Sequence, residues 1–414
     1  MPAQRGDSMM FLLYALVFFL GTSTAQAATF YVATTGNDSN PGTVQQPFRT
    51  IVKGVSVLKP GDTTYVRAGT YNESINTNYV VFPSGTSWSN PVTLAAYPGE
   101  TVTLVGYIGL AVPASYIIVS GLVIDANNNV EGFSINQGSH HIRLQNCEVR
   151  NTYTNGIGIW WGNNNGLSSD YNEILNCTIH HIASMGGSGF SDQPFGYGRG
   201  HGIYMTTSNN IIRGNTFYDV GEYSIHQWVG SPQFANNNII EGNLITRSGH
   251  NTTRYGGVCC GGITANVGSG TIIRNNIVYG NEVNGIEVGN TCINCKAYNN
   301  TTYNNPTWNI YSSDGGSGIE VRNNIAYPKG IYSGTGTQSS NNLNTNPNFV
   351  NAAGNDFHVL SSSPAVDAGM TLSAVTVDFS RSPRPQGSGY DIGAYEFGGA
   401  GGTTINPPRN LRVQ

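Results

Sequence analysis

A short phrase of alternating apolar and polar residues recurs along the chain. It reads IIRGNTF at residues 211–217, and related phrases stand at 117–124, 143–149, 173–179, 239–245, 272–278, 296–303 and 319–327. Aligning the phrases brings one column into register: Leu122, Cys147, Cys177, Asn215, Asn243, Asn276, Asn300 and Asn324. Successive members of this column are 24 to 38 residues apart. Periods of this size are typical of solenoids, in which each repeat buries its apolar face against its neighbours.

A second apolar phrase follows each repeat, with no helical pattern between the two. It reads HGIYM at 201–205, and its other copies are EGFSI, NGIGI, YSIHQ, GGITA, NGIEV, WNIYS and KGIYS. Alternating apolar residues over so few positions predict short strands. Gly and Asn between them predict turns, where left-handed backbone is needed. We therefore predict an all-β fold in which coils stack as a parallel β-helix.

The asparagine column fits this prediction. Coils of a β-helix are about 4.8 Å apart, so a buried amide can hydrogen-bond to the same residue one coil above and below, as in an asparagine ladder. Each Asn could instead be a simple turn former. Five consecutive asparagines in register favour the ladder.

Over residues 28–397 the pattern resembles the right-handed parallel β-helix proteins of the pectate-lyase-like superfamily. The opening at 29–71 is similar to that of many secreted members, and the helical spacing of Phe48, Ile51, Val52 and Val55 predicts a short helix capping the first coil. Residues 346–397 resemble a terminal segment called choice-of-anchor. The resemblance implies the architecture but not the reaction, because one fold hosts many functions.

The N-terminus has the features of a secretory signal peptide. An apolar stretch at 9–20 follows Arg5, and AQA at 25–27 predicts cleavage after Ala27. We expect a secreted or cell-surface monomer with the β-helix and its cap at 28–345, the C-terminal segment at 346–397 and a Gly-rich linker and tail at 398–414. No later stretch is apolar enough to span a membrane. The net charge of -4 gives no indication of nucleic-acid binding.

Some charged residues and cysteines are predicted to be structural. Arg213, Glu241 and Arg274 share one column on successive coils and predict an ion-pair stack. The even cysteine count and predicted export favour disulfides. Cys147 and Cys177 could form a bond or remain stacked thiols, and CINC at 292–295 could also be half of a metal site.

The outer face of the second strand carries the candidate functional residues. Tyr204, His226 and Glu287 follow the inward apolar residue on their strands, and Trp160 and Trp228 lie two positions beyond it. We expect aromatic walls over a floor of small residues, which suits sugar rings. His201 lies where a loop joins the strand. Long insertions at 183–200 and 249–262 are expected to overhang this face, and they add three more candidates: Asp192, Arg199 and Arg254.

These residues predict a carbohydrate-active protein acting on a polysaccharide. The leading hypothesis is β-elimination of a uronic-acid polymer, with His226 or His201 as base, Tyr204 as acid and Arg199 or Arg254 facing the substrate carboxylate. The candidate substrate-binding residues are Trp160, Trp228, Arg254, Glu287 and Asp192. The acidic calcium cluster and catalytic Arg or Lys of better-known pectate lyases have no clear match, so no metal ligand is assigned, although calcium at Glu222, Glu287 and Asp192 stays open. The alternatives are a glycoside hydrolase, which needs two paired carboxyl groups, and a non-catalytic glycan-binding or adhesion solenoid.

Overall fold

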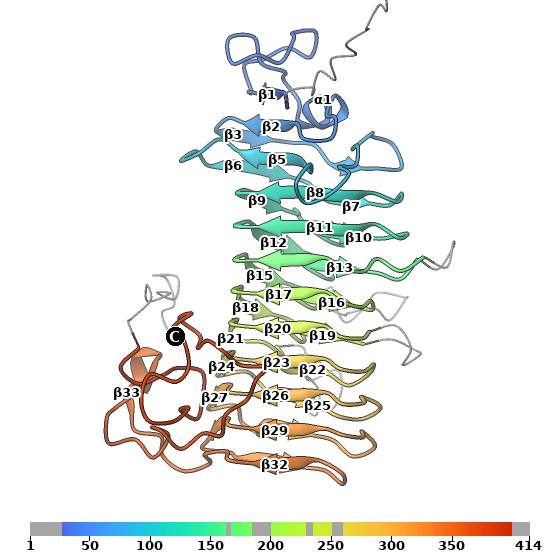
Figure 1. The fold of residues 1–414 in the computed structure, drawn as a ribbon. Helices are drawn as coiled ribbons and strands as arrows, with labels where there is room; N and C mark the ends of the chain where they lie inside the picture. Colours follow the sequence, from blue (N-terminus) through green and yellow to red (C-terminus); the bar gives the residue numbers. More distant parts are fainter. Residues whose placement is uncertain (1–26, 163–166, 184–199, 229–234, 251–259, 400–414) are drawn as a thin grey trace, which may run out of the picture.

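The computed structural model describes residues 27–162, 167–183, 200–228, 235–250 and 260–399. Three long parallel sheets run along a stack of coils (Figure 1). The 12-stranded sheet contains β1 (Thr29–Val32), β2 (Thr63–Val66), β5 (Val92–Ala96), β8 (Ser115–Ser120), β11 (His140–Gln145), β14 (Glu173–Leu175), β17 (Ile211–Arg213), β20 (Ile239–Glu241), β23 (Ile272–Arg274), β26 (Lys296–Tyr298), β29 (Glu320–Arg322) and β32 (Gln338–Ser340).

The other two long sheets have ten strands each. One contains β3 (Gly69–Tyr71), β6 (Val102–Val105), β9 (Leu122–Asp125), β12 (Glu148–Thr152), β15 (Thr178–Ile182), β18 (Thr216–Val220), β21 (Leu244–Thr246), β24 (Ile277–Tyr279), β27 (Thr301–Tyr303) and β30 (Ile325–Tyr327). The other contains β4 (Ile75–Asn76), β7 (Ile108–Leu110), β10 (Phe133–Ile135), β13 (Ile157–Ile159), β16 (Ile203–Met205), β19 (Ile225–Gln227), β22 (Gly261–Ala265), β25 (Asn284–Val288), β28 (Trp308–Ser312) and β31 (Ile331–Ser333).

Each repeated phrase spans two strands, not the single strand that its alternation predicted. In IIRGNTF the chain leaves β17 at Arg213, bends, and enters β18 at Thr216. Gly214 takes φ 68° at the bend, a left-handed conformation that Gly adopts without steric penalty. Gly242 does the same in the next coil, with φ 63°. A coil therefore has three strands and a triangular cross-section.

The asparagine ladder is confirmed and extends one coil further, to Asn342. The backbone N–H and Nδ2 of Asn215 both donate to Oδ1 of Asn243, at 2.9 and 3.0 Å. Asn243 donates in the same way to Asn276, at 2.9 Å for both bonds. The second Nδ2 hydrogen of Asn243 is donated to the carbonyl oxygen of Ile212 in the preceding coil. Each amide is thereby satisfied inside the apolar core, as burial requires.

Both ends of the solenoid carry additional structure. Helix α1 (Ile51–Ser56) buries Ile51 and Val55 over the first coil, as predicted. At the other end, residues 346–399 contain β33 (Phe349–Asn351), the 3₁₀ helix η2 (Ala352–Gly354) and β34 (Asp356–Val359), and lie beside β21, β24 and β27 (Figure 1). There Phe357 packs on Tyr279 of the solenoid, with ring centroids 4.9 Å apart.

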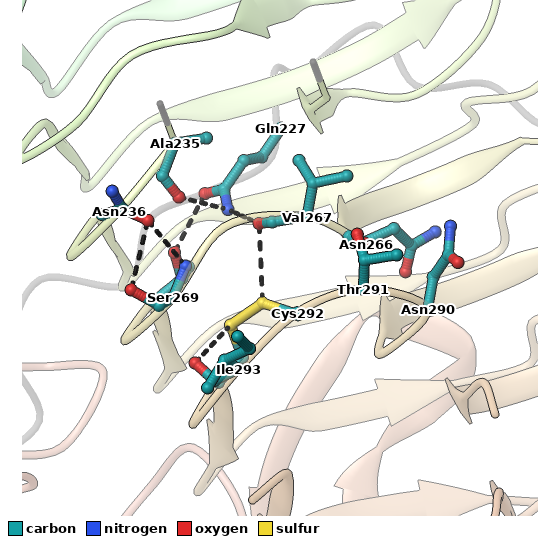
Figure 2. The surroundings of a disulfide bond; sticks show 12 residues. Gln227, Ala235, Asn236, Asn266, Val267, Ser269, Asn290, Thr291, Cys292 and Ile293 are labelled. Atoms are coloured by element: carbon teal, nitrogen blue, oxygen red, sulfur yellow. Dashed lines mark hydrogen bonds between the residues drawn. A yellow bond between two sulfur atoms is a disulfide. The ribbon is translucent and has the colours of Figure 1, made fainter. Parts of the chain in front are cut away.

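Among the described cysteines, Cys260, Cys292 and Cys295 are disulfide-bonded and two others are free. Cys292 and Cys295 form a disulfide in the turn before β26, so CINC is not half of a metal site. Figure 2 shows this turn beneath Val267, whose carbonyl oxygen is 3.5 Å from the Cys292 sulfur. Cys147 and Cys177 are buried free thiols on successive coils. None of the helices within the described ranges is long and apolar enough to cross a membrane.

Candidate functional site

The second phrase of each repeat forms the third strand of its coil, and the outer column that we predicted for it is present in the expected register. Gly158, Tyr204, His226, Thr264 and Glu287 pair in that order from β13 to β25. Their strand neighbours are fully buried inside the coil. These five residues therefore line one outer face, which we call the β16–β22 face after its central strands.

Tyr204 and His226 lie against each other at the centre of this face. Their ring centroids are 5.0 Å apart and their planes are nearly perpendicular, at 82°. Trp160 stacks on the other side of Tyr204 at 4.9 Å, and Trp228 lies 6.2 Å from His226. Tyr204 is only 7% exposed, whereas His226 and both tryptophans are partly exposed. An imidazole and a phenol at this separation can share the removal and return of one proton.

His201 lies behind His226 and does not line the open part of the face. It is 1% exposed, and its Nε2 is 3.0 Å from His226 Nδ1 and 3.1 Å from a carboxyl oxygen of Glu222. Glu222 is itself 2% exposed. A buried carboxylate next to an imidazole holds the ring in one orientation and stabilises its charged form. The arrangement suits a positioning role for His201 and Glu222, with His226 as the group that meets a ligand.

Glu287 lies two coils beyond His226 and is surrounded by neutral donors. Its oxygens accept hydrogen bonds from Asn284 Nδ2 at 2.8 Å, Tyr223 Oη at 3.0 Å and Asn266 Nδ2 at 3.4 Å. Burial raises the pKa of the Glu287 carboxyl group above its usual value, against the opposing effect of these hydrogen bonds. Burial, and then the neighbouring Glu287, also raise the pKa of Tyr223.

Sequence reasoning missed Glu131, at the other end of the β16–β22 face. Its carboxyl group accepts hydrogen bonds from Trp160 Nε1 and Asn155 Nδ2, both at 3.1 Å, and burial raises its pKa. Gly158 leaves the room for this contact, because an added Cβ would lie 2.2 Å from Trp160 Nε1. Its position in the repeat could have revealed it, because Glu131 stands two residues before the inward apolar residue of its strand. The same repeat position holds His201, Tyr223 and Asn284 in other coils.

The small residues just before the apolar position are not the groove floor that we predicted. A Cβ added to Gly202 would lie 2.8 Å from the ring of Phe217, and one added to Gly156 would lie 2.9 Å from Ile179. Both contacts are with core side chains of another sheet. This column therefore faces the interior, and its small residues allow two sheets to approach closely at the turn.

Three predicted site residues, Asp192, Arg199 and Arg254, lie outside the described residues. Among those that are described, no group of three or more His, Cys, Asp or Glu is arranged to hold a metal ion. Glu222 pairs with His201, and Glu287 is occupied by neutral donors. Calcium prefers several oxygen ligands converging on one point, and the carboxyl groups of this face do not converge. The described part of the face does not fit a calcium site.

Comparisons with known proteins agree with this architecture. The family model described as "Pel9A-like, right handed beta helix region" matches residues 30–341. The crystal structure of pectate lyase Pel9A superposes with a TM-score of 0.66 at 18% identity, covering 90% of this chain and 97% of that one. A rhamnogalacturonan lyase superposes with a TM-score of 0.53 at 17% identity, over 78% and 91%. At these identities the superpositions show the fold, and they confirm the predicted right-handed parallel β-helix.

Curated relatives match over shorter segments. Pectate lyase PEL9 of Emericella nidulans is 39% identical over 80 residues, which is 19% of each chain. The uncharacterized protein YwoF of Bacillus subtilis is 30% identical over 142 residues, which is 30% of this chain and 29% of that protein. The matched segments thus span less than a third of either relative. The family model, however, covers most of this chain, which therefore belongs to the Pel9A-like family of right-handed β-helix proteins.

Proposed function

We propose that this protein is a secreted polysaccharide lyase that cleaves a uronic-acid polymer by β-elimination. The contact between Tyr204 and His226 on the outer face of adjacent coils carries the proposal. Both belong to rigid strands, and the buried His201–Glu222 pair supports the imidazole of His226 from behind. A preorganised base and acid on a fixed scaffold are what proton abstraction next to a carboxylate requires. The similarity to a pectate lyase and to a rhamnogalacturonan lyase supports such a substrate.

In the proposed reaction His226 removes the proton at C5 of the uronic acid. The electron pair of that C–H bond forms a C4=C5 double bond, and the bond from C4 to the glycosidic oxygen breaks. Tyr204 donates its proton to the departing oxygen, and proton return from His226 through solvent restores both groups. Arg199 and Arg254 keep their proposed role in neutralising the substrate carboxylate. Trp160 and Trp228 are proposed to stack on sugar rings beside the reacting unit.

Among the described carboxyl groups of the β16–β22 face, the geometry favours a lyase over a hydrolase. Glycoside hydrolases place two carboxyl groups about 5 to 10 Å apart. Glu131 lies just before β10 and Glu287 lies in β25, five coil steps apart, which corresponds to roughly 24 Å at the usual strand spacing. Glu222, between them, is paired with buried His201. A binding-only solenoid remains the second hypothesis, because aromatic side chains beside hydrogen-bonding groups also suit non-catalytic recognition of glycans.

The test is incubation with a panel of polyuronates while ultraviolet absorbance and reducing ends are followed together. A lyase produces unsaturated ends, a hydrolase produces reducing ends alone, and a binding protein produces neither. We expect His226→Ala and Tyr204→Phe each to lower kcat by at least about 100-fold. Tyr311→Phe is the matched control, since Tyr311 lies in the same outer column and stacks on Tyr332 instead. Full activity in the first two variants would refute the assignment of the site.

A further inference from the structure

Tyr223 extends along the axis of the solenoid and joins three coils. It lies just before β19, and its hydroxyl group donates to Glu287 Oε2 in β25, two coils further on, at 3.0 Å. The same hydroxyl oxygen accepts a hydrogen bond from the backbone N–H of Cys260, which directly precedes β22 in the intervening coil. Tyr223 is 8% exposed. The far end of its ring is therefore held by residues of two following coils.

The carboxyl group of Glu287 is directed toward donors of the protein itself. One oxygen accepts from Asn284 Nδ2 at 2.8 Å, and the oxygen that meets the Tyr223 hydroxyl also accepts from Asn266 Nδ2 at 3.4 Å. The residue as a whole is 7% exposed. A buried carboxyl group with three protein donors is better suited to holding a neighbouring side chain than to meeting a ligand.

The ring of Tyr223 packs against the proposed base. Its centroid is 5.0 Å from that of His226, with the planes at 44°, and 6.1 Å from that of His201. Tyr204 contacts the same His226 ring from the preceding coil. The hydrogen bond between His226 Nδ1 and His201 fixes one point of the imidazole, and the ring could still turn about that point. Packing by the two tyrosines opposes this rotation.

We propose that Tyr223 is a positioning residue that keeps His226 oriented toward the substrate, and that Glu287 anchors Tyr223 instead of binding the substrate itself. The inference rests on the proposed function, because His226 is the base of that reaction. Misplacement of a reacting group by about 1 Å lowers a rate by on the order of 100-fold. An anchored ring beside the base therefore matters for the reaction without touching the substrate.

Steady-state kinetics on a polyuronate distinguishes anchoring from substrate binding. Tyr223→Phe keeps the ring and removes its hydroxyl group, and Glu287→Met removes the acceptor. We expect each change to lower kcat about tenfold and to leave KM within about twofold, because the substrate contacts are retained. The double variant should lose no more than Glu287→Met alone, since both changes break the same hydrogen bond. If Glu287 bound the substrate, Glu287→Met would raise KM and the two effects would add.

The matched control is Tyr298→Phe. Tyr298 is 3% exposed, and its hydroxyl group donates to Glu320 Oε2 at 2.5 Å in the 12-stranded sheet. The change therefore removes the same kind of buried bond away from the β16–β22 face. We expect Tyr298→Phe and Tyr223→Phe both to lower the Tm, and only Tyr223→Phe to lower kcat.

NMR of the full chain with ¹⁵N-labelled histidine reports the orientation of His226 without any turnover. His226→Asn assigns the signals of this ring by their disappearance. We expect one set of imidazole signals in the wild type and in Tyr298→Phe. In Tyr223→Phe we expect a second set or marked broadening, as the ring takes more than one orientation.

Two results would overturn the inference. One is a His226 spectrum in Tyr223→Phe that matches the wild type, and the other is a raised KM at unchanged kcat in Glu287→Met. The NMR result does not depend on the reaction. A wild-type protein that produces no unsaturated ends from any polyuronate would reject the lyase, while a second set of signals in Tyr223→Phe would still support the positioning of His226 by Tyr223.

Discussion

At the scale of single residues, position relative to the coil decides whether a charged group is structural or available for chemistry. Glu241 illustrates the structural case, as predicted from its register. Its carboxyl group lies between Arg213 and Arg274, and its side chain is largely buried. Burial acts to raise the pKa of Glu241, but Arg274 and Arg213 outweigh it and hold the pKa below its usual value. His226, in contrast, is supported by other residues and still partly exposed.

The pKa shift of Glu241 leads to a prediction about stability. A carboxyl group with a lowered pKa stabilises the fold at pH values above its unfolded-state pKa, and this stabilisation is lost as pH falls through the folded-state pKa. Glu241→Gln should therefore lower the free energy of unfolding at pH 7 by about 3 kcal/mol, with the difference from wild type shrinking under acidic conditions. Urea unfolding at several pH values measures it. Glu173→Gln, which breaks the more exposed pair with Arg143, is the control and should lose less than about 1 kcal/mol. A loss independent of pH would contradict the explanation.

At the scale of strands and turns, the sequence predicted the features that recur in every coil, but it did not predict where the chain bends within a coil. The ladder and the register of Tyr204 with His226 followed from alignment of the phrases, because each coil reuses the same hydrogen-bonding positions. The division of each phrase into two strands was missed, because a single left-handed residue at Gly214 makes the bend, and it shifts the inward positions by one so that Ile212, Asn215 and Phe217 all face the core. Glu131 was missed for a related reason. The turn before β10 breaks the alternation of inward and outward residues. Glu131, two residues before the inward Phe133, therefore faces outward and not inward.

The asparagine ladder predicts that removing a fully buried asparagine lowers the free energy of unfolding more than removing one at the partly exposed end of the ladder. Asn276→Ala removes the acceptor for two donors of Asn243 and leaves the carbonyl oxygen of Ile240 without its partner. Each buried group left unsatisfied costs about 1 to 3 kcal/mol, so the free energy of unfolding should fall by at least about 3 kcal/mol. Asn342→Ala at the partly exposed end of the ladder should lose about 1 kcal/mol, because water can replace the lost acceptor. Chemical denaturation of both variants provides the comparison, and equal losses would argue against the ladder as the source of stability.

At the scale of the whole molecule, the C-terminal segment covers one side of the solenoid. Tyr279 belongs to an aromatic column at the outer end of the middle strand, and Phe357 and Phe379 pack over it. Such contacts join residues about 80 to 100 positions apart, and no local pattern encodes them. Because coils of a solenoid contact mainly their neighbours, the segment is an addition to the stack and not part of its repeating core. Its attachment should therefore be separable from the folding of the coils.

Arg384 is a buried charged residue that links this segment to the solenoid. Its guanidinium group is fully buried and pairs with Glu396, and it donates to Gly393 O at 2.8 Å and to Asn275 Oδ1 of the solenoid at 3.2 Å. Arg384→Met leaves the Glu396 carboxylate buried without a cation, a change that costs about 3 to 5 kcal/mol.

In that variant we expect calorimetry to show a new transition below the main one, and limited proteolysis to cut first within 346–399 while the coils stay intact. Arg381→Met, in the same segment, removes a half-exposed side chain that reaches Glu241 at 3.6 Å, and should behave like the wild type. A single transition at the wild-type temperature in Arg384→Met would mean that apolar contacts such as Phe357 on Tyr279 hold the segment in place without the buried ion pair.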